Sequence, residues 1–164
     1  RLLVTHPKLY LKTRLYIYGE GPERNKLEKL IREYQLAGQI YLMGLVDRKE
    51  IANKMSESDC FILVSRLETF GVVYIEAMAM GLPVIATRCG GPEDFVNKEN
   101  GILIPNIDIN EIAKSMRYLY QNIDRYDKKR ISDIAKDKFS SKSIARKLVQ
   151  IYEESIEECK RHMI

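Results

Sequence analysis

Two glutamates mark the segment of this chain that is best suited to chemistry. Glu68 lies in a polar loop, and Glu76 follows after seven intervening residues, inside an apolar run that predicts a helix. A carboxylate in an apolar helix is costly to bury unless hydrogen-bond donors surround it. The pair therefore indicates a site for a ligand that carries hydroxyls. A buried ion pair between Glu76 and a lysine or arginine is the alternative.

Gly71 lies between the two glutamates, where the predicted helix begins. The free N–H groups of a helix N-terminus and the helix dipole favour phosphate. Because glycine has no Cβ, the backbone at Gly71 could approach a phosphate closely. The segment thus favours a ligand with both hydroxyls and negative charge. Taken without its neighbours, Glu68 could also be an acidic residue placed there by the dipole alone.

Strand-like and helix-like segments alternate along the chain, which predicts an α/β fold with a mostly parallel sheet and helices on both faces. The strands are expected at 15–18, 40–43, 60–64, 83–86 and 102–104. Helices are expected at 23–36, after Asp47, through Glu76, briefly after Gly90, and from Pro105 to the end. Ligands of such sheets bind beyond the carboxyl ends of the strands. Three loops meet that condition, at 19–22, 65–71 and 88–93.

Composition excludes several classes of protein. The chain has 164 residues, a net charge of +4 and ten tyrosines that are not interleaved with a basic patch, so nucleic acid is not expected as a partner. No apolar run is as long as a membrane span. The three cysteines are widely spaced, which suits a reducing compartment, and we expect a cytoplasmic protein.

The segment 125–147 carries nine basic and three acidic residues. Such a segment is usually a solvated helical face. The alternative is peripheral contact with an anionic membrane surface, at its inner face.

The ordered set of motifs resembles one family, the retaining glycosyltransferases of the GT-B fold, of the family 4 type. The matching segments are 15–22, 44–46, 65–71, 76–87, 90–93 and 100–101. The paired glutamates are the signature of that family. The resemblance implies a three-layer Rossmann-like domain, the donor-binding C-terminal half of a GT-B enzyme, spanning 1–164 as one domain of a longer two-domain protein.

The resemblance also implies roles for individual residues. Glu68 is expected to contact donor-sugar hydroxyls near the reacting carbon, and Glu76 to bind the ribose hydroxyls. The cradle for the sugar and diphosphate is expected from the backbone of four residues, Thr69, Phe70, Gly71 and Val72. The nucleobase is expected to pack against a strand end and its loop, Gly44, Leu45 and Val46.

The same family implies a donor that is a UDP- or GDP-linked sugar, transfer of a hexose to a glycan, lipid-linked or protein acceptor, and no metal or other cofactor. The family's N-terminal acceptor domain, and a first strand with an arginine and a lysine for the leaving diphosphate, are not in this chain. Because that electrostatic contribution is usually the largest in such catalysis, the chain alone is not expected to turn over.

Two other functions remain open on the sequence alone. One is a nucleotide-sugar epimerase or phosphorylase of the same fold, and the other is a non-catalytic nucleotide-binding module. A dinucleotide dehydrogenase is disfavoured, since no Gly-x-Gly-x-x-Gly follows a predicted strand.

Overall fold

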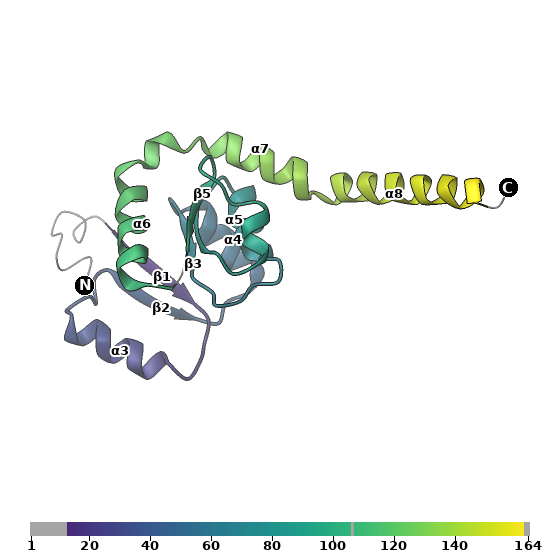
Figure 1. The fold of residues 1–164 in the computed structure, drawn as a ribbon. Helices are drawn as coiled ribbons and strands as arrows, with labels where there is room; N and C mark the ends of the chain where they lie inside the picture. The colour runs from purple at the N-terminus through teal and green to yellow at the C-terminus, as the bar shows by residue number, and fades with distance from the viewer. Residues whose placement is uncertain (1–12, 106, 163–164) are drawn as a thin grey trace. The chain divides into compact units, whose positions relative to one another are not determined.

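The computed structural model describes residues 13–105 and 107–162 (Figure 1). The chain divides into two compact units, Arg1–Lys54 and Met55–Ile164, and each is described by itself. The expectation of a single domain over 1–164 stays a prediction.

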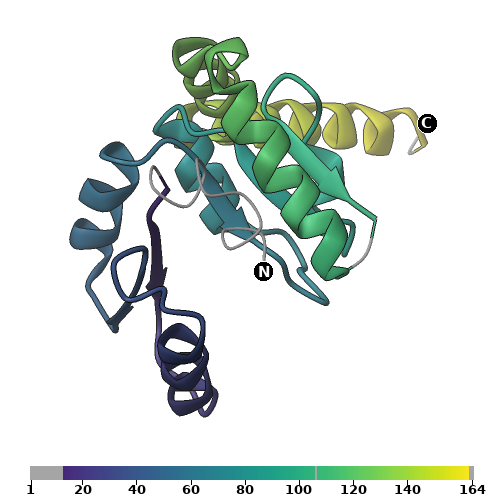
Figure 2. The same ribbon diagram turned by 90° about the vertical axis from the view of Figure 1, so that its left-hand side faces the viewer.

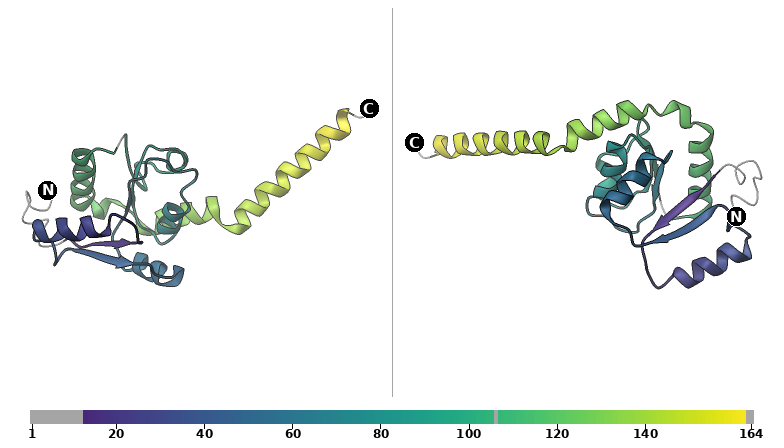
Figure 3. Two further views of the ribbon diagram at one scale, coloured as in Figure 1. Left: turned by 90° about the horizontal axis from the view of Figure 1, so that it is seen from below. Right: turned by 180° about the vertical axis from the view of Figure 1, so that it is seen from behind.

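The first unit contains a two-stranded parallel sheet, β1 (Leu15–Tyr18) and β2 (Ile40–Gly44), which Figure 3 shows as neighbouring arrows. The strands pair in register from Leu15 opposite Ile40, and an irregularity places Tyr18 opposite Gly44. Helix α3 (Arg24–Glu33) connects them and is shorter than the predicted 23–36. It ends early because Gln35 adopts a left-handed backbone with φ of 54°.

Helix α4 (Arg48–Ser56) spans the boundary between the units. Its start follows the predicted capping by Asp47, whose carboxylate accepts a hydrogen bond of 2.8 Å from the N–H of Glu50. A side-chain cap of this kind satisfies one of the donors that a helix N-terminus leaves without a partner.

The second unit is built on a three-stranded parallel sheet in the order β3–β4–β5, with β3 at Phe61–Leu63, β4 at Val84–Thr87 and β5 at Gly101–Ile104. All four residues of β4 are buried, as a central strand requires. The short helix predicted after Gly90 is the 3₁₀ helix η1 (Gly91–Asp94).

Four α-helices complete the second unit. Helix α5 (Val72–Ala79) contacts β3 and β4, and α6 (Ile109–Gln121) contacts β5 (Figure 2). A 3₁₀ turn, η2 (Ile123–Arg125), leads to α7 (Lys128–Phe139), which packs on α5 and is followed by α8 (Ser141–His162). The α/β class, with parallel strands and helices on both faces, is confirmed.

Two details differ from the sequence-based expectations. The described strands pair in two sheets and not in one, with β1 and β3 each at an edge of its own sheet. Within the described residues, the stretch expected to be helical from Pro105 onward is divided into α6, α7 and α8, and Ile109, the first residue of α6, is 73% exposed.

Helix α8 buries none of its residues. Its apolar side chains, among them Ile144, Leu148, Ile151 and Tyr152, are exposed. Within the described ranges, no helix is both long and apolar enough to cross a membrane.

Candidate functional site

The loop that follows β3 is held in place by the loop that follows β4. The hydroxyl of Thr87 donates a hydrogen bond of 2.6 Å to the carbonyl of Ser65. The N–H of Glu68 donates to the carbonyl of Cys89 at 3.0 Å, and the carbonyl of Glu68 accepts from the N–H of Gly91 at 2.8 Å. Both the N–H and the carbonyl of Glu68 are therefore hydrogen-bonded to the neighbouring loop, in the pattern of a parallel β-bridge.

Gly90 and Gly91 make this close approach of the two loops possible. A Cβ on Gly90 would lie 2.6 Å from the carbonyl oxygen of Glu68, and one on Gly91 would lie 2.4 Å from the Cα of Phe70. Gly90 also has a φ of 112°, which favours glycine. The geometry therefore gives this glycine pair a structural role.

Gly71 stands at the N-terminus of α5 in a left-handed conformation, with φ of 88° and ψ of 49°. Its carbonyl accepts a hydrogen bond of 3.0 Å from the N–H of Tyr74, and no side chain caps the helix. The N–H groups of Val72 and Val73, at the start of α5, are thus left for solvent or for an anion. This is the position at which the sequence predicted a phosphate cradle.

Tyr74 fixes α5 against the sheet. Its side chain is fully buried, and its phenol donates a hydrogen bond of 2.7 Å to the carbonyl of Leu63, the last residue of β3. Burial, with a smaller contribution from Cys89, raises the pKa of Tyr74 to about 12. Tyr74 was not singled out from the sequence, although its spacing from Gly71 places it on the first turn of the helix.

Glu76 lies on the exposed face of α5, so the expectation of a buried carboxylate, including a buried ion pair, is wrong. The helix buries Tyr74, Ala77 and Met78 instead, which leaves Glu76 on the opposite face. One turn before it on the same face, Val72 is also exposed. A ligand at the helix N-terminus could therefore reach the Glu76 carboxylate without any rearrangement of the core.

The other predicted residues of this segment surround the same helix start. Glu68 is half-buried and its Cγ is 3.3 Å from where a Cβ on Gly71 would lie. Thr69 is exposed, and Phe70 is 46% exposed. The structure thus places Glu68 and the predicted cradle at the start of α5, and Glu76 on the exposed face about one turn into the helix.

The predicted nucleobase contacts belong to the first unit. Gly44 ends β2 with a φ of 74°, and its carbonyl accepts a hydrogen bond of 2.8 Å from the N–H of Gly19. Leu45 is 80% exposed and Val46 is half-buried. Because the two units are described separately, a shared site between Gly44–Val46 and the cradle stays a prediction.

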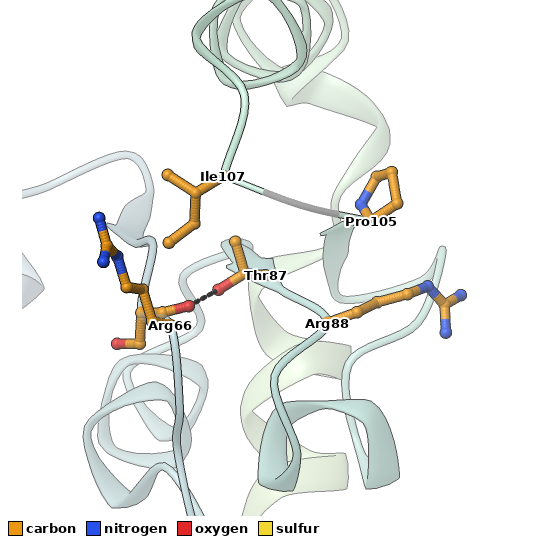
Figure 4. A pocket seen from close by; sticks show the side chains of 6 residues that line it. Arg66, Thr87, Arg88, Pro105 and Ile107 are labelled. Atoms are coloured by element: carbon orange, nitrogen blue, oxygen red, sulfur yellow. Dashed lines mark hydrogen bonds between the residues drawn. The ribbon is translucent and has the colours of Figure 1, made fainter.

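A hollow of about 380 Å³ lies at the carboxyl ends of β3, β4 and β5 (Figure 4). Its lining residues are Ser65, Arg66, Thr87, Arg88, Pro105 and Ile107. Arg88 forms an ion pair of 3.1 Å with Glu93, and both side chains are exposed to solvent. Arg66 was not singled out from the sequence, because a single arginine in a polar loop carries no pattern.

Within residues 13–105 and 107–162, no group of three or more His, Cys, Asp or Glu side chains is placed to bind a metal ion. The expected independence of a metal stays a prediction.

Comparison with known proteins identifies the family. Residues 3–138 match the family model described as "Glycosyl transferases group 1", which covers most of the chain. The chain belongs to the group 1 glycosyl transferases. The resemblance stated from the sequence motifs is thereby confirmed.

Individual group 1 relatives show the same likeness. The N-acetyl-alpha-D-glucosaminyl L-malate synthase of Bacillus anthracis is 30% identical over 142 residues, which are 85% of this chain and 37% of that protein. The sucrose-phosphate synthase of Thermosynechococcus elongatus has a TM-score of 0.73 at 27% identity, over 96% of this chain and 42% of that one.

The pneumococcal O-GlcNAc transferase, solved in complex with UDP and GlcNAc, has a TM-score of 0.72 at 25% identity, over 96% of this chain and 31% of that one. The chain therefore spans less than half of each of these three glycosyltransferase relatives. The names of the relatives favour a glycosyltransferase over an epimerase, a phosphorylase or a non-catalytic module.

Proposed function

We propose that this chain is the part of a retaining glycosyltransferase that binds the nucleotide-diphosphate-sugar donor. The observation that carries the proposal is the start of α5, where Gly71 leaves the first-turn N–H groups uncapped and Glu76 lies exposed one turn further on. The N–H groups at the start of α5 would donate hydrogen bonds to phosphate, and the Glu76 carboxylate would accept them from hydroxyls of the same ligand. A nucleoside diphosphate joined to a sugar has both kinds of group.

The proposed roles follow the arrangement of the groups. The N–H groups of Thr69 to Val72 would bind the diphosphate and orient the sugar, and Glu76 would accept hydrogen bonds from the ribose hydroxyls. Glu68, fixed through its own backbone, would contact the sugar hydroxyls near the anomeric carbon, where positive charge develops in the transition state. UDP or GDP is the proposed carrier, with no metal required.

The whole protein would add an N-terminal acceptor domain and transfer a hexose to a glycan, lipid-linked or protein acceptor, as in polysaccharide biosynthesis. We place it in the cytoplasm, with peripheral contact at the inner face of the membrane. The basic residues of α7 support that contact, since Lys128, Lys129, Arg130, Lys136 and Lys138 are all exposed. Cys60, Cys89 and Cys159 are all free thiols, which agrees with a reducing compartment.

A thermal-shift panel tests the proposal on the chain as it exists. The panel contains UDP, GDP, ADP and their glucose conjugates, with uridine and glucose as controls. A ligand that binds only the folded state stabilises it by about 2.7 kcal/mol at a concentration of 100 Kd. We expect one nucleotide series to raise Tm, and uridine and glucose to do so much less. No shift with any diphosphate up to millimolar concentration would contradict the proposal.

A further inference from the structure

Three phenylalanines from three elements of the second unit form one cluster beside the predicted cradle. Phe70 precedes Gly71, Phe95 follows η1, and Phe139 is the last residue of α7. The ring centroids are 6.1 Å apart for Phe70 and Phe95, 5.9 Å for Phe70 and Phe139, and 5.6 Å for Phe95 and Phe139. All three pairs meet edge to face, the arrangement that aromatic rings prefer.

This cluster, with the glycine pair, holds Phe70 from two directions. Its ring contacts Phe95 and Phe139, while its backbone lies against Gly91, where not even a methyl group would fit. Phe95 is itself 6% exposed and therefore part of the core. The chain direction at Phe70 sets the direction of the next residues, Gly71 and Val72. The cluster is thus positioned to orient the N–H groups that would bind phosphate.

Helix α7 packs on α5 and also contacts Phe70, two residues before α5 begins. Near the C-terminus of α5, the hydroxyl of Ser132 donates a hydrogen bond of 2.6 Å to the carbonyl of Ala79. Near the N-terminus of α5, the contact from α7 is the ring of Phe139 on Phe70. The amine of Lys138 also donates a hydrogen bond of 3.0 Å to the carbonyl of Asp94, which joins the end of α7 to η1.

We propose that Phe139 is a positioning residue for the diphosphate cradle, acting through Phe70 on the N–H groups of Gly71 and Val72. This inference rests on the proposed function. A cradle made of backbone groups cannot adjust by changing a rotamer, so its affinity depends on how firmly the chain is held. A misplacement of about 1 Å in a group that positions a substrate can cost about 100-fold in rate. We therefore expect that loosening the cradle lowers its affinity for a diphosphate by about tenfold.

The first experiment uses no ligand. Amide hydrogen exchange is measured for the peptide that covers 69–74 in the wild type, in Phe139→Leu and in Ser132→Ala. Ser132 is the matched control, since it lies in α7 and contacts the far end of α5. We expect faster exchange of this peptide in Phe139→Leu only. Unchanged exchange in Phe139→Leu, or an equal change in Ser132→Ala, would overturn the inference. Phe139→Met replaces the leucine variant if that variant does not fold.

The second experiment separates positioning of phosphate from a general loss of structure. The dissociation constants of UDP and uridine are measured by calorimetry for the same proteins and for Phe139→Tyr, which keeps the ring. We expect Phe139→Leu to weaken UDP by about tenfold and uridine by less than about twofold, and Phe139→Tyr to bind as the wild type does. Equal weakening of both ligands would overturn the inference. If the wild type binds neither, the proposed function fails and hydrogen exchange alone decides the role of Phe139.

Discussion

The phenol of Tyr74 and the carbonyl of Leu63 are joined by a part-buried hydrogen bond of 2.7 Å. Tyr74 lies in the first turn of α5, and Leu63 is the last residue of β3. The bond therefore fixes the start of the helix at the carboxyl end of the sheet, where the predicted cradle lies. The ring of Tyr74 also meets that of Phe61 edge to face at 5.6 Å.

Tyr74→Phe should lower the free energy of unfolding by about 0.5–1.5 kcal/mol, because it removes the donor of a part-buried hydrogen bond to the carbonyl of Leu63. Urea denaturation measures the change. Tyr152→Phe is the control, since Tyr152 is 63% exposed on α8 and should change stability by less than about 0.5 kcal/mol. Equal stability of Tyr74→Phe and the wild type would show that this hydrogen bond contributes little.

Stability should fall at alkaline pH in a way that depends on Tyr74. Burial raises the pKa of its phenol from 10.0 to about 12, so the folded chain holds this proton more tightly than the unfolded chain does. The contribution is complete below pH 10 and is lost as the pH rises toward 12. The free energy of unfolding, measured from pH 9 to 11.5, should decrease more steeply in the wild type than in Tyr74→Phe. Parallel curves would contradict the assignment.

Gly91→Ala should separate the two loops at the site. The new methyl group would lie 2.4 Å from the Cα of Phe70, and backbone cannot move aside as a side chain can. We expect a loss of about 1–3 kcal/mol, the usual cost of overpacking, together with weaker nucleotide binding. At Gly38, a Cβ would meet nothing within 4 Å, so Gly38→Ala is the control and should be nearly neutral. Denaturation and thermal shift with UDP measure both effects.

The three thiols should differ in reactivity. Burial, reinforced by Asp59, raises the pKa of Cys60 from 9.0 to about 11, which lowers its thiolate fraction at pH 8 by about 100-fold. Cys159 is exposed on α8. Iodoacetamide labelling at pH 8, followed by peptide mass spectrometry, should modify Cys159 first and Cys60 only slowly. In about 8 M urea, which should unfold the chain, all three thiols should react at similar rates. Rapid labelling of native Cys60 would contradict its burial.

The order of elements could be predicted because local patterns determine it. Short apolar runs predicted all five described strands, and β1 was placed at its observed residues, Leu15–Tyr18. Asp47 and Gly71 marked two helix starts through local chemistry, a side-chain cap and a residue without Cβ. Such features need no knowledge of distant residues, so the sequence is sufficient for them.

What could not be predicted depends on contacts between distant segments. The composition of α5 suggested a buried Glu76, yet the choice of the buried face is made by β3, β4 and α7. Phe139 is separated from Phe70 by 69 positions, and no local pattern indicates that their rings meet. The role of Gly91 likewise depends on the loop that lies against it. The candidate site residues could therefore be named from the sequence, and the contacts between the segments that carry them could not.

The central claim is that the start of α5 binds a nucleoside diphosphate through its backbone and Glu76. The most direct test is calorimetric titration of UDP and GDP into the wild type, Glu76→Ala and Glu154→Ala, the last a matched exposed glutamate on α8. We predict that one nucleotide binds the wild type and Glu154→Ala equally and that Glu76→Ala loses most of this affinity, about tenfold or more for a hydrogen-bonded charged group. Binding that is unchanged in Glu76→Ala would contradict the account.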